Sequence, residues 1–162
     1  MKNIFNFILG ILIIIFSNTV FNFFKFSPKI DFILIYIIIL SLYWEQDDYA
    51  LYIISALLGY FVDVSVGMYQ GQCTILFLSI SIVGVLIKDK IRKDYFIVPF
   101  FISSLIIVVS AIYNTIISSI NINHGFVHMF VTNVFYIIVN VIALAVIIGI
   151  VNMSVNYWRN NK

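Results

Sequence analysis

Asp63 is the only acidic residue that lies well inside a long apolar stretch of this chain. It belongs to a run in which Gly59, Asp63, Gly67 and Gly71 recur at every fourth position. At 3.6 residues per turn, such positions lie nearly above one another on one helix face. Small residues at this spacing let the backbone of another helix come close. The sequence therefore predicts a narrow packing stripe that carries one carboxyl group.

Two interpretations of Asp63 stay open at this point. A charge at such a depth is costly unless it is partnered, so these residues usually face the interior of a helix bundle and are functional. In the structural interpretation Asp63 is protonated or paired to a helix end and pins two helices together. In the functional one it binds a partner or takes part in transport. Catalysis is not expected, because acid–base chemistry usually needs a second group with a separated pKa, and the sequence places no other acid or histidine nearby.

A second set of small and polar residues follows heptad spacing further along the chain. Ser104, Ala111 and Ser118 lie seven residues apart, and Asn133 and Asn140 repeat that spacing. Small side chains pack closely and amides bond across helices at such seams in membrane bundles. We interpret these five residues as a secondary packing seam rather than a ligand site.

The remaining residues with chemical potential predict neither a metal nor a cofactor. His124 and His128 have the i, i+4 spacing that can hold a metal on a helix, but no third ligand is near them in the sequence. Cys73 is the single cysteine and lies in an apolar run, which indicates a small packed residue. The sequence shows no nucleophile motif and no phosphate-binding loop. We therefore expect a protein that is not an enzyme.

Composition places the chain in a lipid bilayer. Hydrophobic residues make up 63% of the 162 residues and charged residues 10%, whereas an average soluble domain is about half apolar and about a quarter charged. Such a chain cannot cover its surface with polar groups. Its basic residues lie at the edges of apolar segments, which indicates membrane topology and argues against nucleic acid as a partner.

The predicted fold is an all-α integral membrane protein, a single polytopic domain over residues 1–162 with about six transmembrane helices. The apolar segments lack the alternation that a barrel in lipid requires, and backbone groups in lipid must be paired within their own segment, which leaves helices. Two of the spans are short and are expected either to be tucked among neighbours or to lie where the bilayer thins. The predicted spans are residues 4–24, 30–44, 49–69, 73–87, 95–120 and 129–157.

The basic residues predict the orientation. Loops rich in lysine and arginine stay on the cytoplasmic side of a membrane. Six spans place the basic loop 88–93 on the same side as both ends of the chain, which carry Lys2, Arg159 and Lys162. The sequence thus predicts a multi-pass protein with both termini in the cytoplasm.

The order of these features resembles the family of the bacterial rod shape-determining protein MreD. A short span ends at Tyr43-Trp44, a polar loop follows, and then come the glycine–aspartate pattern Gly59-x3-Asp63-x3-Gly67-x3-Gly71, another span and the basic loop. The resemblance covers about residues 28–94 at the level of motifs, and the rest of the chain by hydropathy. It implies a helical bundle similar to the substrate-binding subunits of energy-coupling-factor transporters.

The resemblance also implies a function and partners. MreD-like proteins are non-enzymatic scaffold subunits of the machinery that synthesises side-wall peptidoglycan and keeps rod-shaped bacteria rod-shaped. They bind the membrane-anchored protein MreC, and through it they connect MreB-like actin with the RodA-like glycosyltransferase and its transpeptidase. The resemblance thus implies location in the bacterial cytoplasmic membrane, with Gly59, Asp63, Gly67 and Gly71 serving partner binding or helix packing.

The alternative interpretation is a substrate-binding membrane subunit of an energy-coupling-factor-type transporter for a vitamin or a metal. Such a subunit encloses a pocket lined by several convergent polar groups. The connections on the predicted outer side, residues 25–29, 70–72 and 121–128, are short and offer little material for a lid. Their length favours the scaffold.

Overall fold

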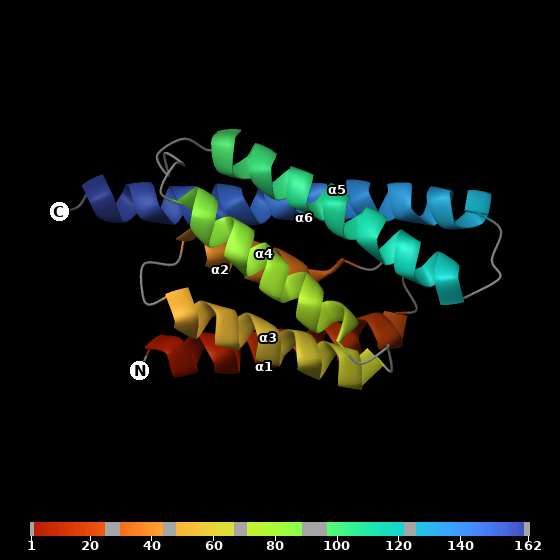
Figure 1. Cartoon of the computed structure of the whole chain (residues 1–162). Coiled ribbons are helices and arrows are strands. Elements are labelled where there is room, and N and C mark those ends of the chain that lie inside the picture. The colour runs from red at the N-terminus through yellow and green to blue at the C-terminus, as the bar shows by residue number, and fades with distance from the viewer. Residues whose placement is uncertain are drawn as a thin grey trace. The chain divides into compact units, whose positions relative to one another are not determined.

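The computed structural model describes residues 2–24, 30–43, 48–66, 71–88, 97–121 and 126–160, with the backbone alone at helical positions 2, 20–24, 66, 117–121, 126–132, 152 and 154–160. These residues form six helices (Figure 1). The helices in chain order are α1 (Lys2–Phe24), α2 (Phe32–Tyr43), α3 (Asp48–Val66), α4 (Gln72–Lys88), α5 (Ile97–Asn121) and α6 (Phe126–Asn160).

The prediction of an all-helical chain with six helices is confirmed. Three of the helices are long and apolar enough to cross a membrane, over residues 48–65 of α3, 97–116 of α5 and 133–151 of α6. Within the described residues the apolar parts of α1, α2 and α4 are shorter. Membrane character is therefore supported, while a multi-pass topology with six full spans stays a prediction.

The chain divides into two compact units, one holding α1 to α4 and the other α5 and α6. In the first unit, α1 and α3 run in one direction and α2 and α4 run in the other (Figure 1). In the second, α5 and α6 run in opposite directions. The single polytopic domain stays a prediction, since one membrane domain can contain two compact units.

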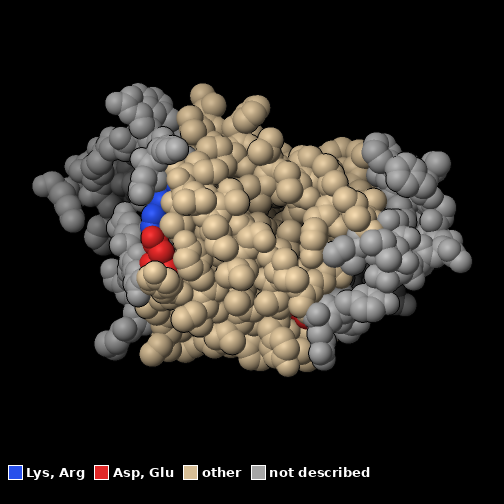
Figure 2. All heavy atoms as spheres, in the orientation of Figure 1, with Lys and Arg blue, Asp and Glu red and all other residues tan. Residues whose placement is uncertain are grey.

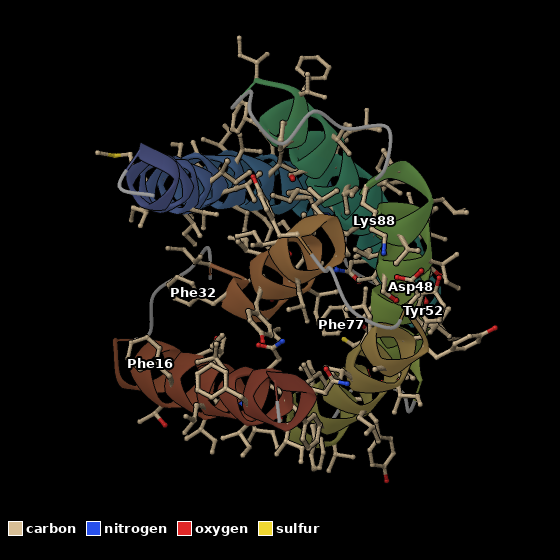
Figure 3. The ribbon with its side chains drawn as sticks, turned by 90° about the vertical axis from the view of Figure 1, so that its left-hand side faces the viewer. Phe16, Phe32, Asp48, Tyr52, Phe77 and Lys88 are labelled. Carbon is tan, nitrogen blue, oxygen red and sulfur yellow. The ribbon has the colours of Figure 1, made fainter. Side chains whose placement is uncertain are left out.

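The α1–α4 unit has an aliphatic interior in which Phe77 is the largest buried side chain. The tyrosine hydroxyl of Tyr36 on α2 donates to the carbonyl oxygen of Asn6 on α1 at 2.8 Å. The rings of Phe16 and Phe32 join the same two helices with centroids 6.3 Å apart (Figure 3). Side chains of this interior that are no more than 2% exposed include Leu34, Ile37, Ile38, Leu51, Leu58 and Phe77.

Helix α2 begins at an aspartate cap. The Asp31 carboxylate accepts a hydrogen bond from the backbone N–H of Leu34 at 3.0 Å, and the Asp31 carbonyl accepts the first helical bond from Ile35 at 3.1 Å. An N-cap of this kind is worth about 1 kcal/mol. It fixes the start of the shortest helix in the chain.

The outer surfaces of the helices are apolar. On the face shown in Figure 2, uncharged residues cover nearly all of the described surface; a positive and a negative side chain touch at one edge, and a small second acidic patch is visible at the lower edge. Large apolar side chains are more than half exposed on five of the six helices, as at Phe5, Ile53, Leu86, Phe101 and Ile150. Contiguous exposed apolar surface of this extent fits a chain surrounded by lipid.

Glycine allows α2 and α4 to approach closely. A Cβ atom added at Gly84 on α4 would lie 2.2 Å from the Ser41 Oγ and 2.5 Å from the Ser41 Cβ on α2. Ser41 is fully buried, and its hydroxyl donates to the Ile38 carbonyl at 2.8 Å. By contrast, a Cβ atom at Gly149 on α6 would meet nothing within 4 Å.

We therefore expect Gly84→Ala to destabilise the protein by about 1–3 kcal/mol through overpacking. Gly149→Ala, the matched control, should leave stability unchanged or raise it by up to about 1 kcal/mol, because alanine favours the helix. Unfolding in detergent micelles measures both. The double variant Ser41→Gly/Gly84→Ala removes the obstructing side chain and should recover part of the loss. A Gly84→Ala protein as stable as the wild type would contradict the close approach.

Candidate functional site at the junction of α3 and α4

The carboxylate of Asp63, in the last turn of α3, meets the first turn of α4. The residue is 1% exposed. Its Oδ1 accepts a hydrogen bond from the backbone N–H of Cys73 at 2.8 Å. Its Oδ2 accepts from the N–H of Gly71 at 3.0 Å, from the N–H of Thr74 at 3.2 Å and from the Thr74 hydroxyl at 2.9 Å. One side chain thus receives four hydrogen bonds from the start of the next helix.

This arrangement compensates for a helix that lacks its own cap. The first N–H groups of any helix have no partner within it. The Gly71 carbonyl accepts the first helical bond of α4, from the Ile75 N–H at 2.9 Å, which makes Gly71 the N-cap residue. That position usually holds Ser, Thr, Asp or Asn, whose side chain supplies an acceptor, and glycine supplies none. Asp63 provides the acceptor from α3 instead, and negative charge is favoured at a helix N-terminus.

Gly71 is required by its backbone conformation rather than by packing. Its φ is 100°, in the region that L side chains rarely adopt, and a Cβ atom built there would meet nothing within 4 Å. Gly71 lies in the turn directly before α4, within the predicted connection 70–72, and so outside the helix that carries Gly59 and Asp63. The chain has to reverse direction between the two helices, and a glycine with positive φ serves that reversal. Gly67 lies outside the described residues.

Gly59 lies where α3 and α4 are closest. A Cβ atom on Gly59 would be 2.5 Å from the Thr74 Cα, 2.7 Å from the Thr74 nitrogen and 2.8 Å from the Cys73 carbonyl oxygen. These are backbone atoms, which cannot move aside as the end of a side chain could. The backbones therefore touch at Gly59, one turn before Asp63, and this contact brings the carboxylate within reach of α4.

The opposite end of the same helix pair holds an ion pair. Lys88 in the last turn of α4 donates to the Asp48 carboxylate in the first turn of α3, and Figure 3 shows the two side chains pointing toward each other. The Lys88 side chain is 12% exposed and that of Asp48 is 41% exposed. Lys88 is thus largely covered, and the more exposed carboxylate of Asp48 keeps the pair at the surface of the unit. The α3–α4 pair thus has a polar contact at each end.

The residues of the predicted seam on α5 and α6 differ in their burial and in their hydrogen-bond partners. Asn133 on α6 donates to the Thr115 hydroxyl on α5 at 2.7 Å. Ala111 and Asn140 are buried, whereas Ser104 is partly exposed and donates to the carbonyl of Phe100 in its own helix. The side chain of Ser118 lies outside the described residues.

Sequence reasoning missed two buried serines of α5. Ser103 and Ser110 are 0% and 1% exposed and repeat the heptad one position before the predicted seam. Ser110 donates to the Ile107 carbonyl at 2.8 Å, and the Ser103 hydroxyl has no hydrogen-bond partner among the described residues. Ser103 and Ser110 are seven residues apart, so spacing alone does not distinguish them from Ser104 and Ala111. The neighbouring side chains of Ile106 and Ile107 are also buried.

The arrangement is suited to holding helices together. An ionised carboxylate offers about four lone-pair sites, and Asp63 receives four hydrogen bonds within the chain. In the part of the chain that the structure describes, no group of three His, Cys, Asp or Glu residues could hold a metal ion. His124 lies outside the described residues, and only the backbone is described at His128. Thr74 is a functional residue that the sequence analysis did not single out, although it stands three positions after the capping glycine.

Comparisons of the chain with models of known protein families, with curated proteins and with solved structures found no match.

We expect Asp63→Asn to destabilise the protein by about 1–3 kcal/mol, the cost of a buried group left without a partner. An amide keeps one acceptor oxygen and replaces the other with a donor that faces a backbone N–H of α4. Asp63→Ala removes every acceptor and should destabilise the protein further. Equilibrium unfolding in detergent micelles measures both, with Ser104→Ala as the control on a partly exposed position. Equal stability of Asp63→Ala and the wild type would contradict the capping role.

Proposed function

We propose that this chain is a non-enzymatic membrane scaffold subunit of the bacterial cell-elongation machinery. In this proposal it lies in the cytoplasmic membrane, binds an MreC-like membrane-anchored protein, and supports the synthesis of side-wall peptidoglycan. The resemblance of residues 28–94 to the MreD family supports the particular machinery. The three helices long and apolar enough to cross a membrane support the location.

The hydrogen bonding of Asp63 is the observation that favours a scaffold over an enzyme or a carrier. Asp63 is the one acid deep within an apolar segment and so the strongest candidate for chemistry. Its two oxygens already receive hydrogen bonds from Gly71, Cys73 and Thr74. A carboxylate used in this way fixes two helices and is not free to bind a substrate or to transfer a proton.

The contacts of Gly59 and Asp63 also bear on which surface the proposed MreC-like partner would bind. The space beside Gly59 is filled by the backbone of α4, and Asp63 is buried against the same helix. We therefore propose that Gly59 and Asp63 maintain the scaffold and that the transmembrane helix of the MreC-like protein contacts other surfaces. Through that partner the chain would connect with MreB-like actin, the RodA-like glycosyltransferase and its transpeptidase.

Co-purification of an MreC-like protein from the native host tests this proposal. Gly59→Ala should lower the abundance of the protein in the membrane, because the added methyl group meets the α4 backbone. The amount of partner recovered per folded molecule should stay at the wild-type level. Gly149→Ala is the matched control and should change neither quantity.

Three outcomes would contradict parts of the proposal. A Gly59→Ala protein of normal abundance that loses the partner would show that the stripe contacts it directly. Absence of any MreC-like partner from the wild-type preparation would count against the scaffold. Depletion that leaves rod shape normal but creates a vitamin requirement would favour the transporter subunit instead.

The proposed topology has six spans and both termini in the cytoplasm. Reporter fusions after Lys162 should have cytoplasmic activity, and fusions within residues 121–125 should have periplasmic activity, because the basic loop 88–93 stays inside. A fusion at residue 46 should agree with the one at the C-terminus. A periplasmic C-terminus would rule out this topology.

A further inference from the structure

The charged side chains described in the α1–α4 unit lie at two levels along its helices. The first level holds the Asp48–Lys88 ion pair. The second holds Asp63 with its contacts on Gly71 and Thr74. Because one residue advances a helix by 1.5 Å, Asp48 and Asp63 are about 22 Å apart along α3, and Thr74 and Lys88 about 21 Å apart along α4.

The other two helices of the unit place polar groups at the same levels. Helices α1 and α3 run in the same direction, and Asn18 of α1 donates to the Ser65 hydroxyl of α3 at 3.2 Å, next to the Asp63 level. Gly10 faces Leu58 in the same register. Asn3 therefore lies within about one helical turn of the Asp48 level, and about 22 Å from Asn18.

The two ends of helix α2 lie near the same two levels. It runs in the same direction as α4, and Ser41 faces Gly84. This register places Asp31, the cap of α2, at the level of Thr74, and Tyr43 near the level of Lys88. The distance from Asp31 to Tyr43 along the helix is about 18 Å.

Between the two levels the exposed side chains are apolar except for Tyr60 and for Ser79, whose hydroxyl donates to the Ile75 carbonyl of its own helix. Ile53 is 61% exposed and Leu57 is 43% exposed on α3, while Ile82 and Leu86 on α4 are 41% and 68% exposed. Ser65, at the second level, is itself exposed, so polar atoms reach the surface there. The unit thus has an apolar belt bounded by a polar layer on either side.

This belt is shorter than an ordinary membrane. The hydrocarbon layer of a typical bilayer is about 30 Å thick, and tilting the helices would shorten the belt further along the membrane normal. By segment length alone, the apolar parts of α5 and α6, with 20 and 19 residues, extend about 30 Å and about 28 Å. The 18-residue segment of α3 extends about 27 Å, and the apolar parts described in α1, α2 and α4 are shorter. A short hydrophobic belt is accommodated by thinning the bilayer at a modest cost for each ångström of mismatch.

We propose that the α1–α4 unit fits a hydrocarbon layer about 21 Å thick and thins an ordinary bilayer around itself, so that short-chain lipid is its preferred neighbour. This inference rests on the membrane insertion proposed above. It adds a physical role to the scaffold: mismatch favours the association of helices, so a thinned zone gathers partners whose spans are also short.

Lipid selection measured with brominated lipids tests the proposal. The purified chain is reconstituted in vesicles of dimyristoleoyl, dioleoyl or dierucoyl phosphatidylcholine mixed with brominated dioleoyl lipid, and quenching of tryptophan fluorescence reports which lipid lies next to the protein. In Trp158→Phe the reporter is Trp44, which directly follows α2 in the sequence. In Trp44→Phe the reporter is Trp158 on α6.

We expect Trp44 to report a preference of about twofold or more for dimyristoleoyl over dioleoyl lipid, because the mismatch is smaller. Trp158 should report a weaker preference for the short lipid. Replacing the first polar layer in Asp48→Leu/Lys88→Leu should lengthen the belt and move the Trp44 preference toward dioleoyl lipid. The exchanged pair Asp48→Lys/Lys88→Asp, the matched control, keeps the layer and should leave the preference unchanged.

Several outcomes would overturn the inference. One is a preference of Trp44 for dioleoyl or dierucoyl lipid in the Trp158→Phe protein, whose polar layers are intact. Equal lipid preferences of the leucine variant and the exchanged pair would show that the layer does not set the thickness. A protein that fails to float with vesicles would overturn the membrane insertion itself, which is a failure of the proposed function and is distinguishable from the other two.

Discussion

The N–H groups at the start of α4, which have no acceptor within the helix itself, are the constraint on which the α3–α4 pair depends. In water such groups bond to solvent, whereas in lipid each one must find a partner within the protein. Gly71 occupies the cap position and supplies no side chain, so the acceptor has to come from elsewhere. Asp63 supplies it from α3, with four hydrogen bonds of 2.8 to 3.2 Å. A buried carboxylate is costly alone, but here it stabilises the fold because it accepts hydrogen bonds from N–H groups that would otherwise lack an acceptor.

The packing of α3 on α4 follows from this contact. The carboxylate reaches the α4 backbone only because Gly59 allows the two helices to touch one turn earlier. With Asp63 fixed at one end, the two helices run side by side in register, and Lys88 arrives beside Asp48 at the other end. One hydrogen-bonded junction and one close approach thus determine the register of the pair and the separation of its polar layers.

The sequence patterns predicted where the helices lie more completely than they predicted the contacts between the helices. Apolar runs without alternation could only be helices in lipid, and the recurrence of small residues correctly drew attention to Gly59 and Asp63. The sequence also predicted that the chain reverses at residues 70–72. It did not predict the positive φ of Gly71 or the hydrogen bonds of Thr74 with Asp63, because these depend on how α3 and α4 meet. On α5 the sequence analysis chose Ser104 and Ala111, whereas Ser103 and Ser110 have the same spacing and are both buried, because packing contacts rather than spacing decide which side faces inward.

The two units differ in the factor that limits their apolar length. In α5 and α6 the apolar segments run for 20 and 19 residues, and the amide of Asn133 is paired across the helices with Thr115. In the first unit the described charged side chains lie at the helix ends, where Asp31 and Asp63 serve as caps. Caps limit helix length, because an N-cap residue marks the point beyond which the backbone is no longer helical. The groups that satisfy the backbone of α2 and α4 therefore also determine how thick a hydrocarbon layer this unit fits, so the stability of the fold and its effect on the membrane have the same physical origin.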